Sequence, residues 1–302
     1  MNKNCVICVK KDKGSINTLN LFINDIKDYE YGVKASKLLY KCNSCGLISI
    51  HPNFQSNELL GLYPENYSSY LNKSHSKSLI SHLQNFINNR EAIKVSKLIP
   101  KNGTILEVGC GNGLFLESVV RYRPDINLIG FDIKETEFIN KELIDFYVGE
   151  FENYQEELES CDLIYFSNLI EHVINPNIFL DKCNSLLKHK GIVYGVTPSH
   201  NSIDRKIFKK FWGGYHYPRH LNIFNDSNIV TLLNLSNFKL IKVSGSYGFW
   251  YISIANFLFP LHGYKKRGIL FAFCSLIFLP IDILINLFFV TGSMTFIGQK
   301  VE

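Results

Sequence analysis

The chain has 302 residues, of which 46% are hydrophobic and 20% charged, and its formal net charge is +5. This composition excludes disorder over most of the length, because disorder requires low hydrophobicity and high net charge, and it suffices for one large core with a small added module. The charge is also milder than the dense basic face of a nucleic-acid-binding protein, so no nucleic-acid partner is expected.

The N-terminal segment, residues 1–50, is defined by two cysteine pairs. Because it has no apolar run of signal-peptide length, we expect a cytoplasmic protein, in which disulfides are rare. A Cys-x-x-Cys turn places two thiolates on one metal ion, and two such turns fill a tetrahedral zinc site. A redox pair or unliganded thiols is the alternative. We predict a small zinc-ribbon-like segment with structural zinc on Cys5, Cys8, Cys42 and Cys45.

Residues 51–100 are predicted to form a helical linker or lid. Apolar residues recur at helical spacing from Leu79 to Leu98, and Pro100 ends the pattern.

Residues 101–246 alternate short apolar runs with helical patterns, which is typical of a parallel sheet covered on both faces. Two later runs predict further strands, the second after an apolar insertion, so residues 292–302 are assigned to the same α/β domain. The apolar runs are 104–108, 126–131, 162–166, 191–196, 238–243 and 294–299.

A glycine-rich turn follows the first of these strands. Gly109, Gly111 and Gly113 let the backbone approach a ligand closely, and the helix that begins after them presents free N–H groups. A dinucleotide-binding fingerprint requires a third glycine where Leu114 stands. The turn therefore departs from the pattern typical of NAD binding, although a Rossmann-like turn without any cofactor has the same appearance.

Two carboxylates flank this turn. Glu107 precedes it and would repel a pyrophosphate, but it could accept hydrogen bonds from an ammonium group. Asp132 ends the next strand, where a carboxylate can accept both hydroxyls of a ribose. A ribose, an ammonium group and an unphosphorylated linker describe S-adenosylmethionine better than NAD.

These residues resemble the class I S-adenosylmethionine-dependent methyltransferases. The chain is most similar to a bacterial branch that carries an N-terminal four-cysteine zinc-binding segment and is often found in surface-polysaccharide biosynthesis. The matching stretches span nearly the whole chain in order. They are Cys42–Leu47, Leu62–Tyr67, Ile105–Gly113, Gly130–Asp132, Leu169–His172 with Asn175-Pro176, Leu186–Gly191 and Tyr217–Leu221.

The resemblance implies a Rossmann-like seven-stranded sheet whose last strand is antiparallel. It also implies a cofactor site at the ends of four strands. Glu107 and the glycines would contact the cofactor, Asp132 and Ile133 would lie at the ribose end, Glu150 and Phe151 would lie near the adenine, and Ser167 and Asn168 would flank the methionine part.

Three histidines are candidates for the catalytic base, because an imidazole has a pKa near neutrality. His172 follows the fourth strand of the α/β domain, and His216 and His220 lie in the segment 213–220. For His172, a helix-start residue bonded to backbone is an equal alternative. Tyr217 and Arg219 suit an acceptor pocket, although Arg219 fits a structural ion pair equally well.

Residues 247–291 form an apolar insertion. The stretch 268–290 has Asp282 as its one charged residue, so it is long enough to suggest a membrane segment. A single crossing would separate two strands of one sheet, and two crossings would put Lys265, Lys266 and Arg267 on the outer face. A membrane-associating helical pair on the inner face of the cell membrane, peripheral or monotopic, avoids both problems. A homodimer interface is the alternative.

We therefore expect a cytoplasmic, membrane-associated methyltransferase that uses S-adenosylmethionine and contains structural zinc. A sugar or glycan hydroxyl is the acceptor that the resemblance implies, and a lipid-linked precursor would suit a membrane-associated protein. Methylation of a quinone or of a sugar-nucleotide carbon is the second hypothesis. A catalytically inactive zinc-bearing binding module and an NAD-dependent oxidoreductase represent other classes.

Overall fold

The computed structural model describes residues 4–11, 18–63, 79–135, 139–155, 159–246, 248–258, 277–278, 284–285 and 292–301. The motif predicted at 62–67 continues beyond Tyr63 into residues outside this set. Most of the predicted insertion, including its basic residues 265–267, also lies outside the described residues.

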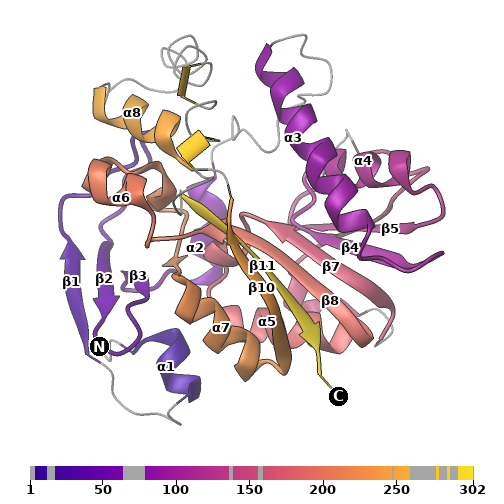
Figure 1. The fold of residues 1–302 in the computed structure, drawn as a ribbon. Helices are drawn as coiled ribbons and strands as arrows, with labels where there is room; N and C mark the ends of the chain where they lie inside the picture. The colour runs from indigo at the N-terminus through magenta and orange to yellow at the C-terminus, as the bar shows by residue number, and fades with distance from the viewer. Residues whose placement is uncertain are drawn as a thin grey trace.

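A seven-stranded sheet forms the centre of the molecule, in the order β10-β11-β8-β7-β4-β5-β6 (Figure 1). Neighbours from β8 to β6 pair in parallel, whereas β11 is antiparallel to both β8 and β10. This confirms the predicted sheet with an antiparallel last strand. The strands are β4 (Thr104–Val108), β5 (Asn127–Asp132), β6 (Asp145–Val148), β7 (Cys161–Ser167), β8 (Leu187–Pro198), β10 (Phe238–Gly245) and β11 (Ser293–Lys300).

Helices cover both faces of this sheet, as the apolar strands require. Strand β4 illustrates why: Ile105 packs into one core and Leu106 and Val108 into the other, because successive side chains of a strand point to opposite faces. Helices α3 (Leu79–Ser96) and α4 (Leu114–Tyr122) lie on one side, and α5 (Pro176–Leu186) and α7 (Asp226–Leu235) on the other (Figure 1).

A second, antiparallel sheet has the order β1-β2-β3-β9. Its first three strands come from the N-terminal segment, whereas β9 comes from a stretch just after the predicted acceptor segment 213–220. A shared core joins the two parts and includes Leu39, Ile50, Trp212 and Tyr215. The strands are β1 (Leu19–Ile23), β2 (Leu38–Cys42), β3 (Ile48–His51) and β9 (Asn222–Ile223).

Short helices connect these layers. Helix α1 (Val6–Lys11) contacts α5 and α7, and α8 (Trp250–Leu258) contacts α6 (Ile203–Phe208). No helix in the described part of the chain is both long and apolar enough to cross a bilayer. The remaining short helices are α2 (Ser56–Leu59), η1 (Leu60–Leu62), η3 (Phe151–Asn153), η4 (Ile170–His172), η5 (Lys209–Phe211) and η6 (Gly213–Tyr215).

Gly195 in β8 lies where this strand packs closely beside β11, so a substitution at this position tests that packing. A Cβ atom at this position would lie 2.2 Å from Phe296 Cζ and 2.6 Å from Phe166 Cε2, and both rings are fully buried. We expect Gly195→Ala to lower the free energy of unfolding by about 2 kcal/mol or more through overpacking, measured by urea denaturation. Gly61→Ala is the control, since nothing lies within 4 Å of its added Cβ; equal stability of the two variants would contradict this packing.

Candidate active site

The glycine turn between β4 and α4 lies at the carboxyl ends of the parallel strands. It is tied to the neighbouring strand, because the N–H of Gly109 donates to the carbonyl of Phe131 at 2.7 Å. Gly109 and Gly113 have φ angles of 77° and 74°, in the left-handed region that glycine tolerates. A Cβ on Gly113 would also lie 2.9 Å from Ile144 Cδ1. Glycine is therefore required at position 113, where the turn packs tightly against Ile144 just before β6.

Asp132 is held in place by this turn. Its carboxylate accepts hydrogen bonds from the backbone N–H of Gly111 at 2.8 Å and of Lys134 at 3.2 Å. The side chain is buried, and burial raises its pKa despite these hydrogen bonds.

Glu107 is the second buried carboxylate of the site. Its Oε2 atom has no hydrogen-bond partner among the described residues. Burial, with a further contribution from the charge of Asp132, raises the pKa of Glu107 well above its usual range. Two buried carboxylates and an unsatisfied acceptor atom favour a ligand that brings positive charge and hydrogen-bond donors. The residues present therefore fit the ammonium and ribose groups of S-adenosylmethionine and oppose a phosphate.

The other residues predicted at the cofactor lie along the same edge of the sheet, because β4, β5, β6 and β7 are parallel and in register. Ile133 is 48% exposed just beyond Asp132. Ser167 ends β7, and the exposed side chain of Asn168 follows it. Phe151 differs from these, because its ring is buried against Phe131.

Glu150 lies beyond the end of β6. Its side chain is exposed, and its Oε2 accepts a hydrogen bond from Asn153 Nδ2 at 3.1 Å.

The three predicted histidines form one cluster next to this edge. The ring centroid of His220 lies 4.6 Å from that of His172 and 5.0 Å from that of His216. His172 lies in η4, directly after β7, while the other two come from the segment 213–220. The fold therefore unites residues that the sequence separates.

Hydrogen bonds distinguish the roles available to the histidines. His216 Nδ1 donates to Glu30 Oε1 at 2.8 Å, because a carboxylate accepts, and its Nε2 accepts from Arg219 Nε at 2.8 Å. Both ring nitrogens of His216 are therefore occupied. Among the three, His216 is the one placed to orient neighbours rather than to take a proton.

His172 and His220 each use Nδ1 on a backbone carbonyl. His220 Nδ1 donates to Gly214 O at 2.8 Å, and His172 Nδ1 to Arg219 O at 3.1 Å, with the Tyr63 hydroxyl 3.0 Å away. Because carbonyl oxygens only accept, Nε2 of each ring carries the lone pair. Burial lowers the pKa of His172 to about 3 and that of His220 well below its usual range, so both rings stay neutral. His172 thus lies close after the carboxyl end of β7, as expected for a base, and it also makes the backbone hydrogen bond expected of a helix-start residue.

Arg219 forms the structural ion pair that the sequence left open. Its guanidinium makes two hydrogen bonds to Asp28, at 2.8 and 3.0 Å, and neither side chain is more than 1% exposed. Tyr217 is also buried, and its hydroxyl donates to the carbonyls of Ala35 and Lys37. These two residues, predicted to bind substrate, instead bind the segment 24–37 in this conformation.

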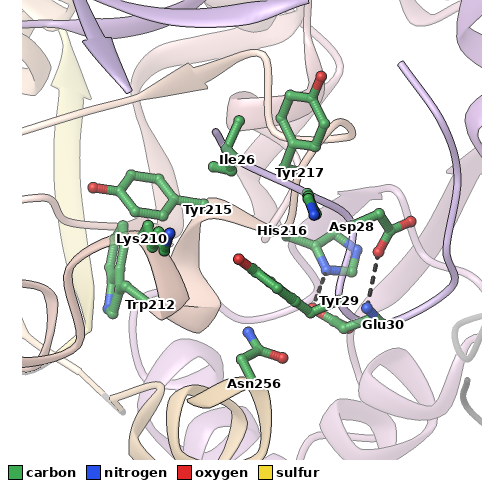
Figure 2. A pocket seen from close by; sticks show the side chains of 11 residues that line it. Ile26, Asp28, Tyr29, Glu30, Lys210, Trp212, Tyr215, His216, Tyr217 and Asn256 are labelled. Carbon is green, nitrogen blue, oxygen red and sulfur yellow. Dashed lines mark hydrogen bonds and ion pairs between the residues drawn. The ribbon is translucent and has the colours of Figure 1, made fainter. Parts of the chain in front are cut away.

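Figure 2 shows a small pocket lined in part by Tyr29, His216 and Asn256. It contains about 220 Å³ of empty space, part of which is open to solvent. The dashed contact from His216 to Glu30 crosses from the segment 213–220 to the N-terminal segment (Figure 2).

Sequence reasoning missed four residues at this site: Asp28, Glu30, Tyr63 and Glu171. The first two lie in a polar loop that has no recognisable motif. Tyr63 and Glu171 stand inside stretches that carry the family resemblance, so those motifs were the available signal.

The four predicted metal-binding cysteines are gathered at one point. Cys5 Sγ lies 3.5 Å from Cys45 Sγ, and Cys8 Sγ lies 3.8 Å from Cys42 Sγ. The S···S edge of a tetrahedral zinc–thiolate site is about 3.8 Å when each Zn–S bond is about 2.3 Å. All four sulfur atoms lie within 4.8 Å of one another, so this donor set fits a tetrahedral metal ion.

The cysteine cluster is anchored to the large domain. Asn225, which caps α7, and Asn228 both donate to the carbonyl of Cys45. On the other side, Asn177 at the start of α5 donates to the carbonyl of Val6 at 2.8 Å. The cluster therefore connects the N-terminal segment to two helices of the seven-stranded sheet.

Comparison with known proteins identifies a family for most of this domain. Residues 81–243, more than half of the chain, match the family model described as a methyltransferase domain. The model covers the glycine turn, the strand-end carboxylates and all three histidines.

Curated relatives match over shorter stretches. The chain is 28% identical over 101 residues to a ubiquinone biosynthesis O-methyltransferase of Mesorhizobium japonicum, covering 31% of this chain and 40% of that one. It is 31% identical over 96 residues to malonyl-[acyl-carrier protein] O-methyltransferase 2 of Ilyobacter polytropus, covering 30% of this chain and 37% of that one. The match thus spans less than half the length of these relatives.

Solved structures share the fold at low sequence identity. A SAM-dependent methyltransferase from Archaeoglobus fulgidus superposes with a TM-score of 0.50 at 18% identity, covering 72% of this chain and 94% of that one. Geranyl diphosphate methyltransferase in complex with SAM gives a TM-score of 0.50 at 12% identity, covering 70% of this chain and 85% of that one.

The Asp28–Arg219 pair leads to a prediction about stability. We expect Asp28→Asn to lower the free energy of unfolding by about 3 kcal/mol, because it removes the carboxylate that pairs directly with a buried guanidinium. The control is Asp25→Asn, in the same loop as Asp28, which removes an exposed ion pair with Lys210. This change should lower the free energy of unfolding by less than about 1 kcal/mol. Urea denaturation of both variants measures the difference, and equal losses would contradict it.

The same pair has a pH signature. Burial alone would raise the pKa of Asp28, but the hydrogen bonds and charge of Arg219 outweigh it and lower the pKa below its usual range. The stability that this depressed pKa contributes is present above the unfolded-state pKa and is lost as the pH falls through the folded-state value. Below about pH 4, stability should therefore decline less steeply in Asp28→Asn than in the wild type.

Proposed function

The chain belongs to the class I S-adenosylmethionine-dependent methyltransferases, and from this premise we propose that it methylates a hydroxyl oxygen of a sugar or glycan precursor in surface-polysaccharide biosynthesis. The acceptor class rests on the four-cysteine segment and the ordered motifs of the resembling branch. The observation that carries the cofactor assignment is the pair of buried carboxylates, Glu107 and Asp132, and one oxygen atom of Glu107 has no hydrogen-bond partner in the described part of the chain.

Glu107 and Asp132 would hold the cofactor by its ammonium group and its ribose hydroxyls. The glycine turn gives it space, and Ser167 and Asn168 would flank its methionine part. When bound, S-adenosylmethionine supplies a methyl group on a positively charged sulfur, and the C–S bond breaks as the new O–C bond forms. Because the methyl group is already activated, the main task of the protein is alignment of the acceptor oxygen.

The histidine cluster supports the proposal that the acceptor is a hydroxyl. A hydroxyl must lose its proton as the oxygen is methylated, and neutral imidazoles with a lone pair on Nε2 assist that loss. His172 and His220 provide such atoms. His216 would instead keep Arg219 in position, and the backbone carbonyl of Arg219 in turn holds His172.

A phenolic hydroxyl of a quinone precursor is the second candidate acceptor. It is favoured by the names of the curated relatives, several of which are ubiquinone biosynthesis O-methyltransferases. Methylation of a sugar-nucleotide carbon would need the same cofactor residues and remains a further candidate.

We also propose that the protein acts at the inner face of the cell membrane, where a lipid-linked acceptor would be found. Ile207 on α6 and Phe257 and Leu258 on α8 are each more than half exposed. Lys206 and Lys209 are exposed beside Ile207 in the chain. Apolar side chains flanked by lysines are typical of a surface that contacts anionic lipid headgroups.

The cysteine cluster is proposed to hold one structural zinc ion. Four sulfur ligands fill the coordination sphere, so the ion would stabilise the fold rather than take part in methyl transfer. Its place between the N-terminal segment and helices α5 and α7 supports that role.

The cofactor assignment is tested by calorimetry with S-adenosylmethionine. The wild type should bind, and Asp132→Asn and Glu107→Gln should each weaken binding at least tenfold, because each removes a charge-assisted hydrogen bond to the ligand. Glu142→Gln changes an exposed carboxylate elsewhere and serves as control. Unchanged affinity in both variants would exclude Glu107 and Asp132 as the cofactor site.

The zinc proposal predicts one zinc ion per chain by elemental analysis. Cys42→Ser should lower the zinc content and the melting temperature together, since a structural zinc ion contributes folding free energy directly. Cys183→Ser, a buried cysteine outside the cluster, is the control for the loss of a thiol, and it should keep its zinc. A zinc-free wild type of full stability would refute the proposal.

The acceptor proposal is tested with radiolabelled S-adenosylmethionine and host membrane or glycan extracts. Label should enter a carbohydrate product that yields an O-methyl sugar on hydrolysis, and more label should enter with membranes than with soluble extract. Label found in a quinone fraction would instead support the second candidate.

A further inference from the structure

A second group of ligand-type side chains lies within the histidine cluster. One ring nitrogen each of His172 and His220 and one carboxylate oxygen of Glu171 all lie within 4.8 Å of one another. Two imidazoles and a carboxylate are a donor set that transition-metal ions prefer.

Each of these three side chains is oriented by a partner behind it. Thr197 Oγ1 donates to Glu171 Oε2 at 2.8 Å. The two histidines donate their Nδ1–H groups to the carbonyls of Arg219 and Gly214. Metal-binding histidines and carboxylates usually have such outer partners, which fix the ring and leave Nε2 for the metal.

One atom of this group is an acceptor without a donor among the described residues. Glu171 is fully buried, and its Oε1 has no hydrogen-bond partner among the residues that the structure describes. This oxygen lies 3.8 Å from Nε2 of His220, which also carries a lone pair. A buried acceptor left unpaired is costly, so this arrangement favours an occupant with positive charge.

Arg219, the arginine of the segment 213–220, has other partners. The guanidinium of Arg219 is directed to Asp28 and to His216 Nε2. Its charge is therefore balanced by Asp28, a separate carboxylate, and not by Glu171.

We propose that Glu171, His172 and His220 bind one divalent transition-metal ion, such as Mn²⁺, Fe²⁺ or Zn²⁺, which binds the acceptor oxygen for methylation. The role in methylation rests on the proposed function, whereas the metal site itself does not. Three protein ligands leave coordination positions open, as in catalytic rather than structural metal sites.

The ion would activate the acceptor as a Lewis acid. Coordination lowers the pKa of a bound hydroxyl, so its O–H bond breaks and the proton passes to solvent water. The oxygen then forms a bond to the methyl carbon, and the electron pair of the C–S bond remains on sulfur. In this mechanism His172 and His220 act as metal ligands, and the metal ion takes over the assistance with proton loss that the two rings would give directly in its absence.

Mn²⁺ binding followed by electron paramagnetic resonance tests the site on the full chain with its zinc retained. Mn²⁺ is chosen because it prefers nitrogen and oxygen ligands, so the cysteine cluster does not compete. We expect one Mn²⁺ per chain, with pulsed-resonance couplings to histidine nitrogens. Glu171→Gln and His220→Asn should each weaken binding at least tenfold, while His189→Asn, which changes an exposed histidine on β8, should not.

Two measurements keep this test decisive if a variant misfolds. The histidine couplings are recorded on the wild type, and S-adenosylmethionine affinity checks each variant's cofactor site. Absence of Mn²⁺ binding at millimolar concentration, or binding without histidine couplings, would overturn the metal site and leave a proton as the occupant. A wild-type protein that binds Mn²⁺ but not S-adenosylmethionine would count against the proposed function and not against the metal site.

Discussion

The buried ion pair between Asp28 and Arg219 is the contact on which the arrangement of the histidine cluster depends. Arg219 is bound on one side by the N-terminal segment and on the other by His216, and its own carbonyl holds His172. A charge that deep in the protein is stable only with its partner in place. The N-terminal segment therefore supports the histidine cluster, since its Asp28 supplies the counter-charge that keeps Arg219, and with it His172 and His216, in position.

Buried carboxylates with one oxygen atom unpaired among the described residues recur at this edge of the sheet. Glu107 on β4 and Glu171 after β7 are both buried, and each has an oxygen atom without a hydrogen bond among the described residues. Burial raises the pKa of each. Such groups reduce stability in the absence of a ligand, which is the usual cost of a site preorganised for positive charge.

Much of this fold could be predicted from the sequence because its signals are local. Apolar runs mark the strands, and the glycines and Asp132 identify the cofactor edge within about thirty residues of chain. The partners of Arg219 could not be predicted in the same way. Asp28 lies 191 residues earlier and belongs to no motif. Whether an arginine binds a substrate or a buried aspartate depends on tertiary contacts, which hydrophobic periodicity does not encode. Glu171 was visible in the sequence as part of a motif, but its unpaired oxygen became visible only when His220 was brought beside it.

The strand β9 has a consequence for how the protein is made. Because Ile48 and Ser49 of β3 pair with Ile223 and Asn222, the edge of the small sheet stays exposed until those residues leave the ribosome. Unpaired strand edges recruit other chains. During synthesis, the free edge of β3 can therefore pair with another chain in the interval before β9 emerges.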